Sequence, residues 1–328
     1  MTPCRPRPGP EGTAGPLLAS PGRGLEGAMS LLVVLGYVVA VLLFLCFGVA
    51  PVFVWAEERR QFDDMSLFRT IVVVQVWILL TSIEAARLGA LRTFFGVDVR
   101  LEAHTSCRTI ALFILRTFFD GYEVLGEEHL SAARGRPVVV VANHQSMMDV
   151  AAIFTLHLKA AWVAKTTVFW IPGVGWLMAL AGYVPVSRRD KASIKQMYST
   201  CTTRIEEDWS LILFPQGTRN RRKILPFKDG AYNLASDLGV PILPVTICIP
   251  SDIWKNGTKI VSTAHPLVMD TRDKAKVKAD TFRVILTPLA KANGDDMARP
   301  GVLLAKKKAD YKGGGSEPEE PSRVGGGR

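Results

Sequence analysis

Residues 138–149 read Val138-Val139-Val140-Val141-Ala142-Asn143-His144-Gln145-Ser146-Met147-Met148-Asp149, an apolar run that ends in a polar turn. Because the run is short, β-branched and without a polar face, it predicts a strand buried on both sides. His144 and Asp149 stand five residues apart directly after it, which predicts a general base and its orienting carboxylate at the mouth of that strand. The spacing alone is weak evidence, since it arises by chance in about one chain of this kind in four or five.

After residue 136 the chain alternates short apolar runs with segments of helical periodicity. Residues 190–209 carry apolar side chains at helical spacing, and residues 230–238 predict a shorter helix. The other predicted strands are residues 161–164, 183–186, 211–214 and 242–249. Strands separated by helices predict an α/β fold, in which helices flank a mixed, partly parallel sheet.

The N-terminal third of the chain is strongly apolar. Residues 31–55 contain only apolar residues, glycine, tyrosine and proline, and the run exceeds the ~20 residues that a helix needs to cross a bilayer. It predicts a transmembrane helix, because it is too long for a signal peptide and lacks a clear cleavage site. Residues 67–83, with Gln75 inside, predict a second helix that spans, re-enters or lies in one leaflet. Residues 107–119 predict an amphipathic helix on the membrane or on the domain.

Composition divides the chain into four predicted parts. Residues 1–30 contain six prolines and six glycines and predict a disordered segment. Residues 31–100 hold the membrane-anchoring helices, residues 101–300 one enzymatic domain, and residues 301–328 a flexible tail. The five cysteines are scattered without metal-ligand spacing, which argues against a disulfide scaffold or a zinc site.

A net charge of +10 and a pI near 9.5 suit anionic partners, which include nucleic acid, a membrane surface and phosphorylated substrates. The predicted transmembrane helix, and the lack of a basic helix with interleaved aromatic residues, argue against nucleic acid. We therefore expect membrane lipids as partners, and the sequence identifies no protein partner.

Three cations follow predicted strands at equivalent positions. Lys165, Arg188 and Arg219 come shortly after the runs 161–164, 183–186 and 211–214. In an α/β sheet the carboxyl ends of the strands are where ligands bind, so the three side chains predict an anion cradle. Each one alone would also suit a solvated surface charge. Gly217 would let the backbone approach a ligand closely, or it would simply serve an ordinary tight turn.

Two local patterns have alternative interpretations. Ser146 followed three residues later by Asp149 is a capping-box pattern, so the carboxylate has a structural role available to it. The two roles are compatible, since a carboxylate in the first turn of a helix is stabilised by the helix dipole. The cations Arg221, Arg222 and Lys223 either extend the cradle or contact lipid headgroups, and we favour the headgroup role.

These motifs together resemble those of the glycerolipid acyltransferases, specifically the 1-acyl-sn-glycerol-3-phosphate acyltransferases. The likeness covers about residues 120–250. The motifs that carry it are Asn143-His144-x4-Asp149, residues 164–175 and 182–188, Phe214-Pro215-x-Gly217-Thr218-Arg219, residues 225–231, and Val240-Pro241-Ile242-Leu243-Pro244-Val245.

The resemblance implies transfer of a fatty acyl group from acyl-CoA, or from acyl carrier protein in a bacterial setting, to the sn-2 hydroxyl of lysophosphatidate. The product is phosphatidate, in phospholipid biosynthesis. It implies His144 as the general base with Asp149 as its partner, no metal or other cofactor, and an endoplasmic reticulum membrane protein whose site faces the cytosol. The implied acceptor-binding residues are Lys165, Arg188, Gly217, Thr218 and Arg219.

Two alternatives stay open within this resemblance. The acceptor is another lysophospholipid or glycerol 3-phosphate, or the protein is a catalytically impaired lipid-binding member of the same fold. Two departures bear on them: Gln216 stands where the family usually has glutamate, and Pro185 where it more often has an aromatic residue. Glutamine keeps an acceptor oxygen but loses the charge, so we expect activity to be retained with altered acceptor affinity.

Overall fold

The valine run lies in the middle of a seven-stranded sheet. The computed structural model describes residues 48–63, 65–222 and 225–292, and within them the strand order is β1-β7-β6-β2-β5-β3-β4. Every neighbouring pair is parallel except β6 and β7, which are antiparallel. The strands are β1 Tyr122–Leu125, β2 Val139–Ala142, β3 Ala160–Lys165, β4 Val184–Val186, β5 Ser210–Leu213, β6 Ile242–Cys248 and β7 Ile260–Ala264. The predicted mixed, partly parallel α/β sheet is confirmed.

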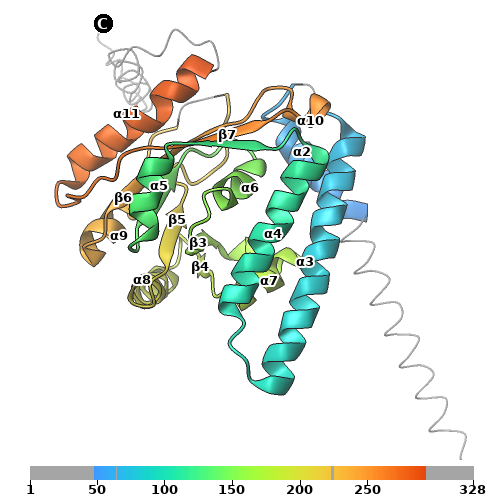
Figure 1. Ribbon diagram of the computed structural model, residues 1–328, viewed down its shortest axis with the longest axis horizontal. Helices are drawn as coiled ribbons and strands as arrows, with labels where there is room; N and C mark the ends of the chain where they lie inside the picture. Colours follow the sequence, from blue (N-terminus) through green and yellow to red (C-terminus); the bar gives the residue numbers. More distant parts are fainter. Residues whose placement is uncertain (1–47, 64, 223–224, 293–328) are drawn as a thin grey trace, which may run out of the picture. The chain divides into compact units, whose positions relative to one another are not determined.

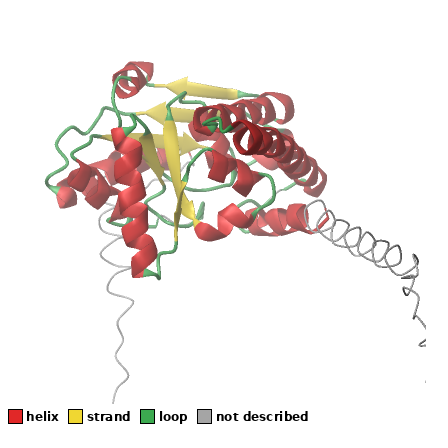
Figure 2. Cartoon of the chain, turned by 90° about the horizontal axis from the view of Figure 1, so that it is seen from below, coloured by secondary structure: helices red, strands yellow, loops and turns green. Residues whose placement is uncertain are grey.

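Helices cover the sheet on two sides (Figures 1 and 2). α3, α4, α6 and α7 pack together on one side, while α8, α9 and α11 lie against strands on the other. The helices are α2 Ala50–Arg59, α3 Leu67–Phe95, α4 Arg100–Phe118, α5 Glu127–Arg134, α6 Met148–Phe154, α7 Val174–Leu180, α8 Lys191–Glu206, α9 Gly230–Leu238, α10 Ile253–Asn256 and α11 Lys274–Ala292, with a 3-10 turn η2 at Thr166–Trp170.

All five predicted strands are present, and all four residues of β2 are fully buried. Two strands at the β1 side of the sheet were missed. β1 alternates half-buried and exposed residues and contains Glu123, so it lacks the continuous apolar run that marks the central strands. β7 carries Ser262 and Thr263 and pairs with β6 in the antiparallel sense, which sequence pattern alone does not reveal.

The second apolar stretch forms part of a long helix. The predicted residues 67–83 are the first half of α3, which has 29 residues. Among the described residues α3 is the one helix long and apolar enough to cross a bilayer, and 33% of its most apolar window is buried by the rest of the fold. The predicted amphipathic segment 107–119 is the second half of α4. Of the predicted first span 31–55, only the last residues are described, and the predicted disordered segment 1–30 and tail 301–328 lie outside the described residues.

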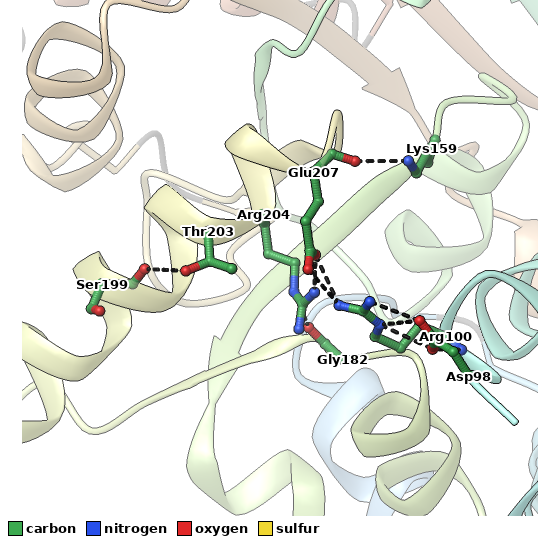
Figure 3. Close-up of polar contacts among 8 residues, drawn as sticks. All are labelled: Asp98, Arg100, Lys159, Gly182, Ser199, Thr203, Arg204 and Glu207. Carbon is green, nitrogen blue, oxygen red and sulfur yellow. Dashed lines mark hydrogen bonds and ion pairs between the residues drawn. The ribbon is translucent and has the colours of Figure 1, made fainter. Parts of the chain in front are cut away.

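A network of ion pairs links the segments that precede β4 and β5 (Figure 3). Arg100, at the start of α4, donates to Asp98 at 2.7–3.0 Å and to both oxygens of Glu207 at 2.8 and 2.9 Å. Arg204 pairs with Glu207 and donates from Nε to the carbonyl oxygen of Gly182 at 3.0 Å. Hydrogen bonds from Arg100 hold the pKa of Asp98 at about 2 and lower that of Glu207. The network lies where β4 and β5 begin, opposite the strand ends that carry the candidate site.

Candidate active site

The polar turn after β2 begins at Asn143, whose side chain is held by hydrogen bonds to β6. Asn143 follows the last residue of β2, is fully buried, and donates from Nδ2 to the carbonyl oxygen of Ile247 at 2.9 Å. Its Oδ1 accepts the backbone N–H of Ile247 at 2.8 Å. These paired bonds fasten the end of β2 to β6, so the next residue, His144, leaves the sheet in a defined direction.

His144 and Asp149 form the predicted pair. Nδ1 of His144 lies 2.7 Å from Oδ2 of Asp149, a carboxylate that is fully buried at the second position of α6. The same oxygen accepts the backbone N–H groups of Gln145 at 2.6 Å and Ser146 at 2.9 Å. Because a carboxylate surrounded by donors only accepts, the proton of the imidazole stays on Nδ1 and the lone pair of Nε2 can accept a proton.

The capping-box interpretation is half right. The carboxylate of Asp149 reaches back to the N–H of Ser146, as in a capping box. The hydroxyl of Ser146 instead accepts the N–H of Met148 at 3.1 Å and donates to Glu58. The bond of Asp149 to the Ser146 N–H and its bond to His144 therefore use the same oxygen and are compatible.

The turn after β5 holds His144 from the other side. Gln216 accepts the backbone N–H of His144 at 2.5 Å, and the backbone N–H of Asn220 donates to the carbonyl oxygen of His144 at 2.9 Å. The ring of Phe214 is stacked on the imidazole, with centroids 4.0 Å apart and planes 1° from parallel. The two strand-to-turn junctions thus meet at one place, and the plane of the imidazole is set by both.

Sequence reasoning missed the acidic partner of the site. Glu58, near the end of α2, is fully buried and accepts from the Ser146 hydroxyl at 2.6 Å and from the Met147 N–H at 2.9 Å. It also pairs with Nη1 of Arg219 at 2.6 Å. Burial raises the pKa of Glu58, and Arg219 opposes that rise. No local sequence signal identifies Glu58, because its partners lie 88 to 161 residues away.

Arg188 and Gly217 are also brought together. Nη1 of Arg188 donates to the carbonyl oxygen of Gly217 at 2.8 Å. Gly217 has φ of 75°, and a Cβ there would lie 2.4 Å from Nη1 of Arg188 and 3.1 Å from Nζ of Lys228. The glycine is needed both for its backbone conformation and for the close approach of two cations. Lys228 is a second residue that the sequence did not single out.

The remaining predicted residues lie at the same edge without direct contacts to the pair. Lys165 ends β3, is exposed, and has no hydrogen bond or ion pair with any residue that the structure describes. Thr218 is exposed in the turn after β5. Since β3, β4 and β5 are parallel neighbours, Lys165 and Arg188 follow strand ends on the edge that carries His144.

The arginines assigned to lipid headgroups have partners inside the protein. Arg221 donates from Nη1 to the carbonyl oxygen of Ile249 at 2.5 Å and lies over the ring of Phe62. Arg222 binds Asp63 at 2.6 Å. Lys223 lies outside the described residues. Arg221 therefore acts as a structural clamp between α2 and the end of β6.

Residues 121–248 match the family model described as Acyltransferase. The human 1-acyl-sn-glycerol-3-phosphate acyltransferase alpha is 30% identical over 245 residues, which are 69% of this chain and 84% of the human protein. The chain belongs to the 1-acyl-sn-glycerol-3-phosphate acyltransferase family. The resemblance inferred from the motifs is confirmed.

Other members of the family match over a shorter range. The chloroplastic enzyme of Brassica napus is 33% identical over 138 residues, which are 42% of this chain and 40% of that protein. The chain thus spans about two fifths of the length of such plant relatives. The crystal structure of the 1-acyl-sn-glycerophosphate acyltransferase PlsC from Thermotoga maritima is 23% identical, with a TM-score of 0.49, and the match covers 66% of this chain and 95% of that one.

Proposed function

We propose that this protein transfers a fatty acyl group from acyl-CoA to the sn-2 hydroxyl of lysophosphatidate and releases phosphatidate. The observation that carries the proposal is the His144–Asp149 pair, which is joined to the turn that bears Arg219 by the hydrogen bond from the His144 N–H to Gln216. Relatives named as 1-acyl-sn-glycerol-3-phosphate acyltransferases, which match this chain at about a third identity, support the same substrate class.

In this mechanism Nε2 of His144 removes the proton of the acceptor hydroxyl as its oxygen attacks the thioester carbonyl. The C–O bond forms, the C–S bond breaks, and the thiolate of coenzyme A leaves and takes the proton from the imidazolium. Thiolate is a good leaving group, so neither a metal nor a covalent enzyme intermediate is needed. Asp149 keeps the proton on Nδ1, and Phe214 holds the plane of the ring.

In this proposal the acceptor phosphate is bound by the cations at the edge of the sheet that carries His144. Arg219 offers a planar fork of donors, and Arg188 stands over Gly217 on the same turn. Lys165 and Lys228 add point charges, and Thr218 a hydroxyl. Fixing the phosphate fixes the glycerol backbone, so the free hydroxyl is delivered to His144 instead of sampling many orientations.

Membrane attachment is part of the proposal, with the site facing the cytosolic leaflet of the endoplasmic reticulum. Large apolar side chains are exposed on and near α3, where a bilayer would cover them. Phe68 is 78% exposed, and in the segment from η2 to α7 Trp170 is 80% and Trp176 55% exposed. Aromatic side chains of this kind gather at the interface between lipid and water. A lipid acceptor would then reach the site from the membrane plane.

The proposal is tested with the full-length protein in detergent micelles, given labelled acyl-CoA and a panel of lysophospholipids and glycerol 3-phosphate. We expect lysophosphatidate to have the highest kcat/KM. His144→Ala should lower kcat at least a hundredfold, since general-base catalysis contributes about 10² to 10⁴ in rate. His129→Ala is the matched control, because His129 contacts Glu128 and not the site.

Three outcomes would contradict the proposal. Preference for another lysophospholipid would change the acceptor but keep the reaction. Equal turnover by wild type and His144→Ala would remove His144 as the base. Absence of transfer to every acceptor, in protein that unfolds cooperatively, would favour the lipid-binding alternative.

A further inference from the structure

Glu58 is a buried carboxylate that the proposed reaction has not yet used. It lies on α2, and its side chain is fully buried at the turn that carries His144. Three donors converge on it: the Ser146 hydroxyl, the Met147 N–H and Nη1 of Arg219. Burying a carboxylate is costly unless donors and a cation compensate it, and this one has both.

Glu58 makes two sets of contacts, one to the turn that follows His144 and one to Arg219. Through Ser146 and Met147 it holds the turn between the catalytic histidine and α6. Through Arg219 it fixes one end of a guanidinium whose side chain is 33% exposed. Only Nη1 of Arg219 is used among the described residues, so Nη2 and Nε stay available to an anion.

Among the groups around this turn, Glu58 is the counter-ion of Arg219, because its carboxylate contacts the guanidinium. Gln216 contributes a neutral amide oxygen, which accepts the N–H of His144. Asp149 uses its bonded oxygen on His144 and on two backbone N–H groups. Asp149 and Glu58 both bind Ser146, so two buried carboxylates already lie at this turn.

We propose that Glu58 is a positioning residue for the acceptor: it orients Arg219 toward the lysophosphatidate phosphate and ties that arginine to the turn that carries His144. This inference rests on the proposed function, because the acceptor phosphate is what Arg219 would bind. It assigns to helix α2 a part in substrate recognition.

The first test compares Glu58→Gln with Glu57→Gln in the full-length protein. Glu57 is the neighbouring acid on α2, and it pairs with Arg60 on the surface at 3.0 Å. We expect Glu58→Gln to raise KM for lysophosphatidate about tenfold to a hundredfold, the effect of losing one hydrogen bond to a charged group. KM for acyl-CoA and kcat should change much less. Glu57→Gln should resemble wild type in all three constants.

The second test moves the carboxylate between the two positions. In the wild-type background Gln216→Glu would add a third buried acid and should lower kcat/KM for lysophosphatidate. In the Glu58→Gln background the same substitution restores the count of two, so it should raise kcat/KM. A purely structural role for Glu58 would not produce this reversal of sign, and Glu58→Asp should retain more activity than Glu58→Gln.

The third test needs no activity. Unfolding of wild type, Glu58→Gln, Arg219→Gln and the double variant forms a cycle, in which the double variant should lose less stability than the two single losses added. If wild type transfers no acyl group, the proposed function fails while this cycle still tests the ion pair. Additive losses in the cycle would overturn the inference. So would equal KM values for Glu58→Gln and Glu57→Gln, or the same effect of Gln216→Glu in both backgrounds.

Discussion

Phe214 lies face to face with His144, the two rings 4.0 Å apart and 1° from parallel. Phe214 is in turn tilted against Trp162, which is buried in β3. The imidazole is therefore held in its plane by a stack that begins in the core of the sheet, and its direction within that plane is set by Asp149.

Phe214→Leu keeps an apolar side chain but removes the flat surface under the imidazole. We expect kcat to fall about tenfold, because the loss of an aromatic pair is worth about 0.5–1.5 kcal/mol and a misdirected base reacts more slowly. Steady-state kinetics with lysophosphatidate measures it. An unchanged kcat would mean that Asp149 alone orients the ring.

Asp149→Asn replaces an oxygen that accepts three hydrogen bonds with an amide that cannot stabilise an imidazolium. The predicted loss in kcat is about 10² to 10⁴, the range for a positioned general base. Thermal unfolding should be recorded beside the kinetics, because the carboxylate also accepts the backbone N–H groups of Gln145 and Ser146. A variant that folds normally and keeps full kcat would contradict the role given to the pair.

Gly217→Ala introduces a Cβ at φ of 75°, where it meets the guanidinium of Arg188 at 2.4 Å. The left-handed conformation alone costs roughly 1–2 kcal/mol for a residue with a side chain. Arg188 must also move, so KM for the acceptor should rise while KM for acyl-CoA stays nearly constant. Arg188→Lys offers a comparison, and equal KM values for the acceptor in all three proteins would argue against a phosphate role for Arg188.

His104 gives the stability of the protein a dependence on pH. Its Nε2 donates to the carbonyl oxygen of Leu158 and its Nδ1 accepts from the Tyr183 hydroxyl, while burial lowers its pKa from 6.5 to about 4. The unfolded chain binds a proton below pH 6.5 and the folded chain does not, so stability is full above 6.5 and falls as pH drops toward 4. The loss attributable to this group is roughly 3 kcal/mol. Denaturation of wild type and His104→Gln between pH 7 and 4 measures it, and equal slopes would refute it.

Glu207→Gln should lower the stability of the protein without changing its catalytic constants. Glu207 belongs to the ion network at the opposite edge of the sheet, and the pKa values of Glu207 and Asp98 are both lowered by Arg100. Their contribution is present above their unfolded pKa values of about 4 and is lost as pH falls below them, for Asp98 through its folded pKa of about 2. We expect a lower melting temperature at pH 7, a difference that vanishes in acid, and unchanged kcat/KM.

The parts of this molecule that sequence alone predicted are the local ones. β2 and β5 are recognisable because strands buried on both faces contain few polar residues. His144 and Asp149 are recognisable because their whole interaction is contained within six residues. β1 escaped prediction because an edge strand alternates exposed and half-buried residues.

Glu58 could not be predicted for a different reason. Its partners come from two turns that the fold brings to α2, and an acid at the end of an apolar segment is ordinarily a solvated charge. The contact between Gln216 and the backbone of His144 is similarly non-local. Long-range polar contacts leave no periodic pattern, so they become visible only when the sheet topology is known.

The segment around the end of α2 also matters to anyone preparing a water-soluble form of this protein. Besides Glu58, this segment supplies Gln61, which accepts the N–H of Arg221, and Phe62, which is buried beneath the same arginine. A fragment starting at residue 48 would discard most of the first apolar run and keep the whole of α2 with these contacts. A fragment starting at residue 67 would lose the buried Phe62 and leave Arg219 without its counter-ion, so its stability and its proposed activity should both fall, a defect that would be mistaken for a missing membrane.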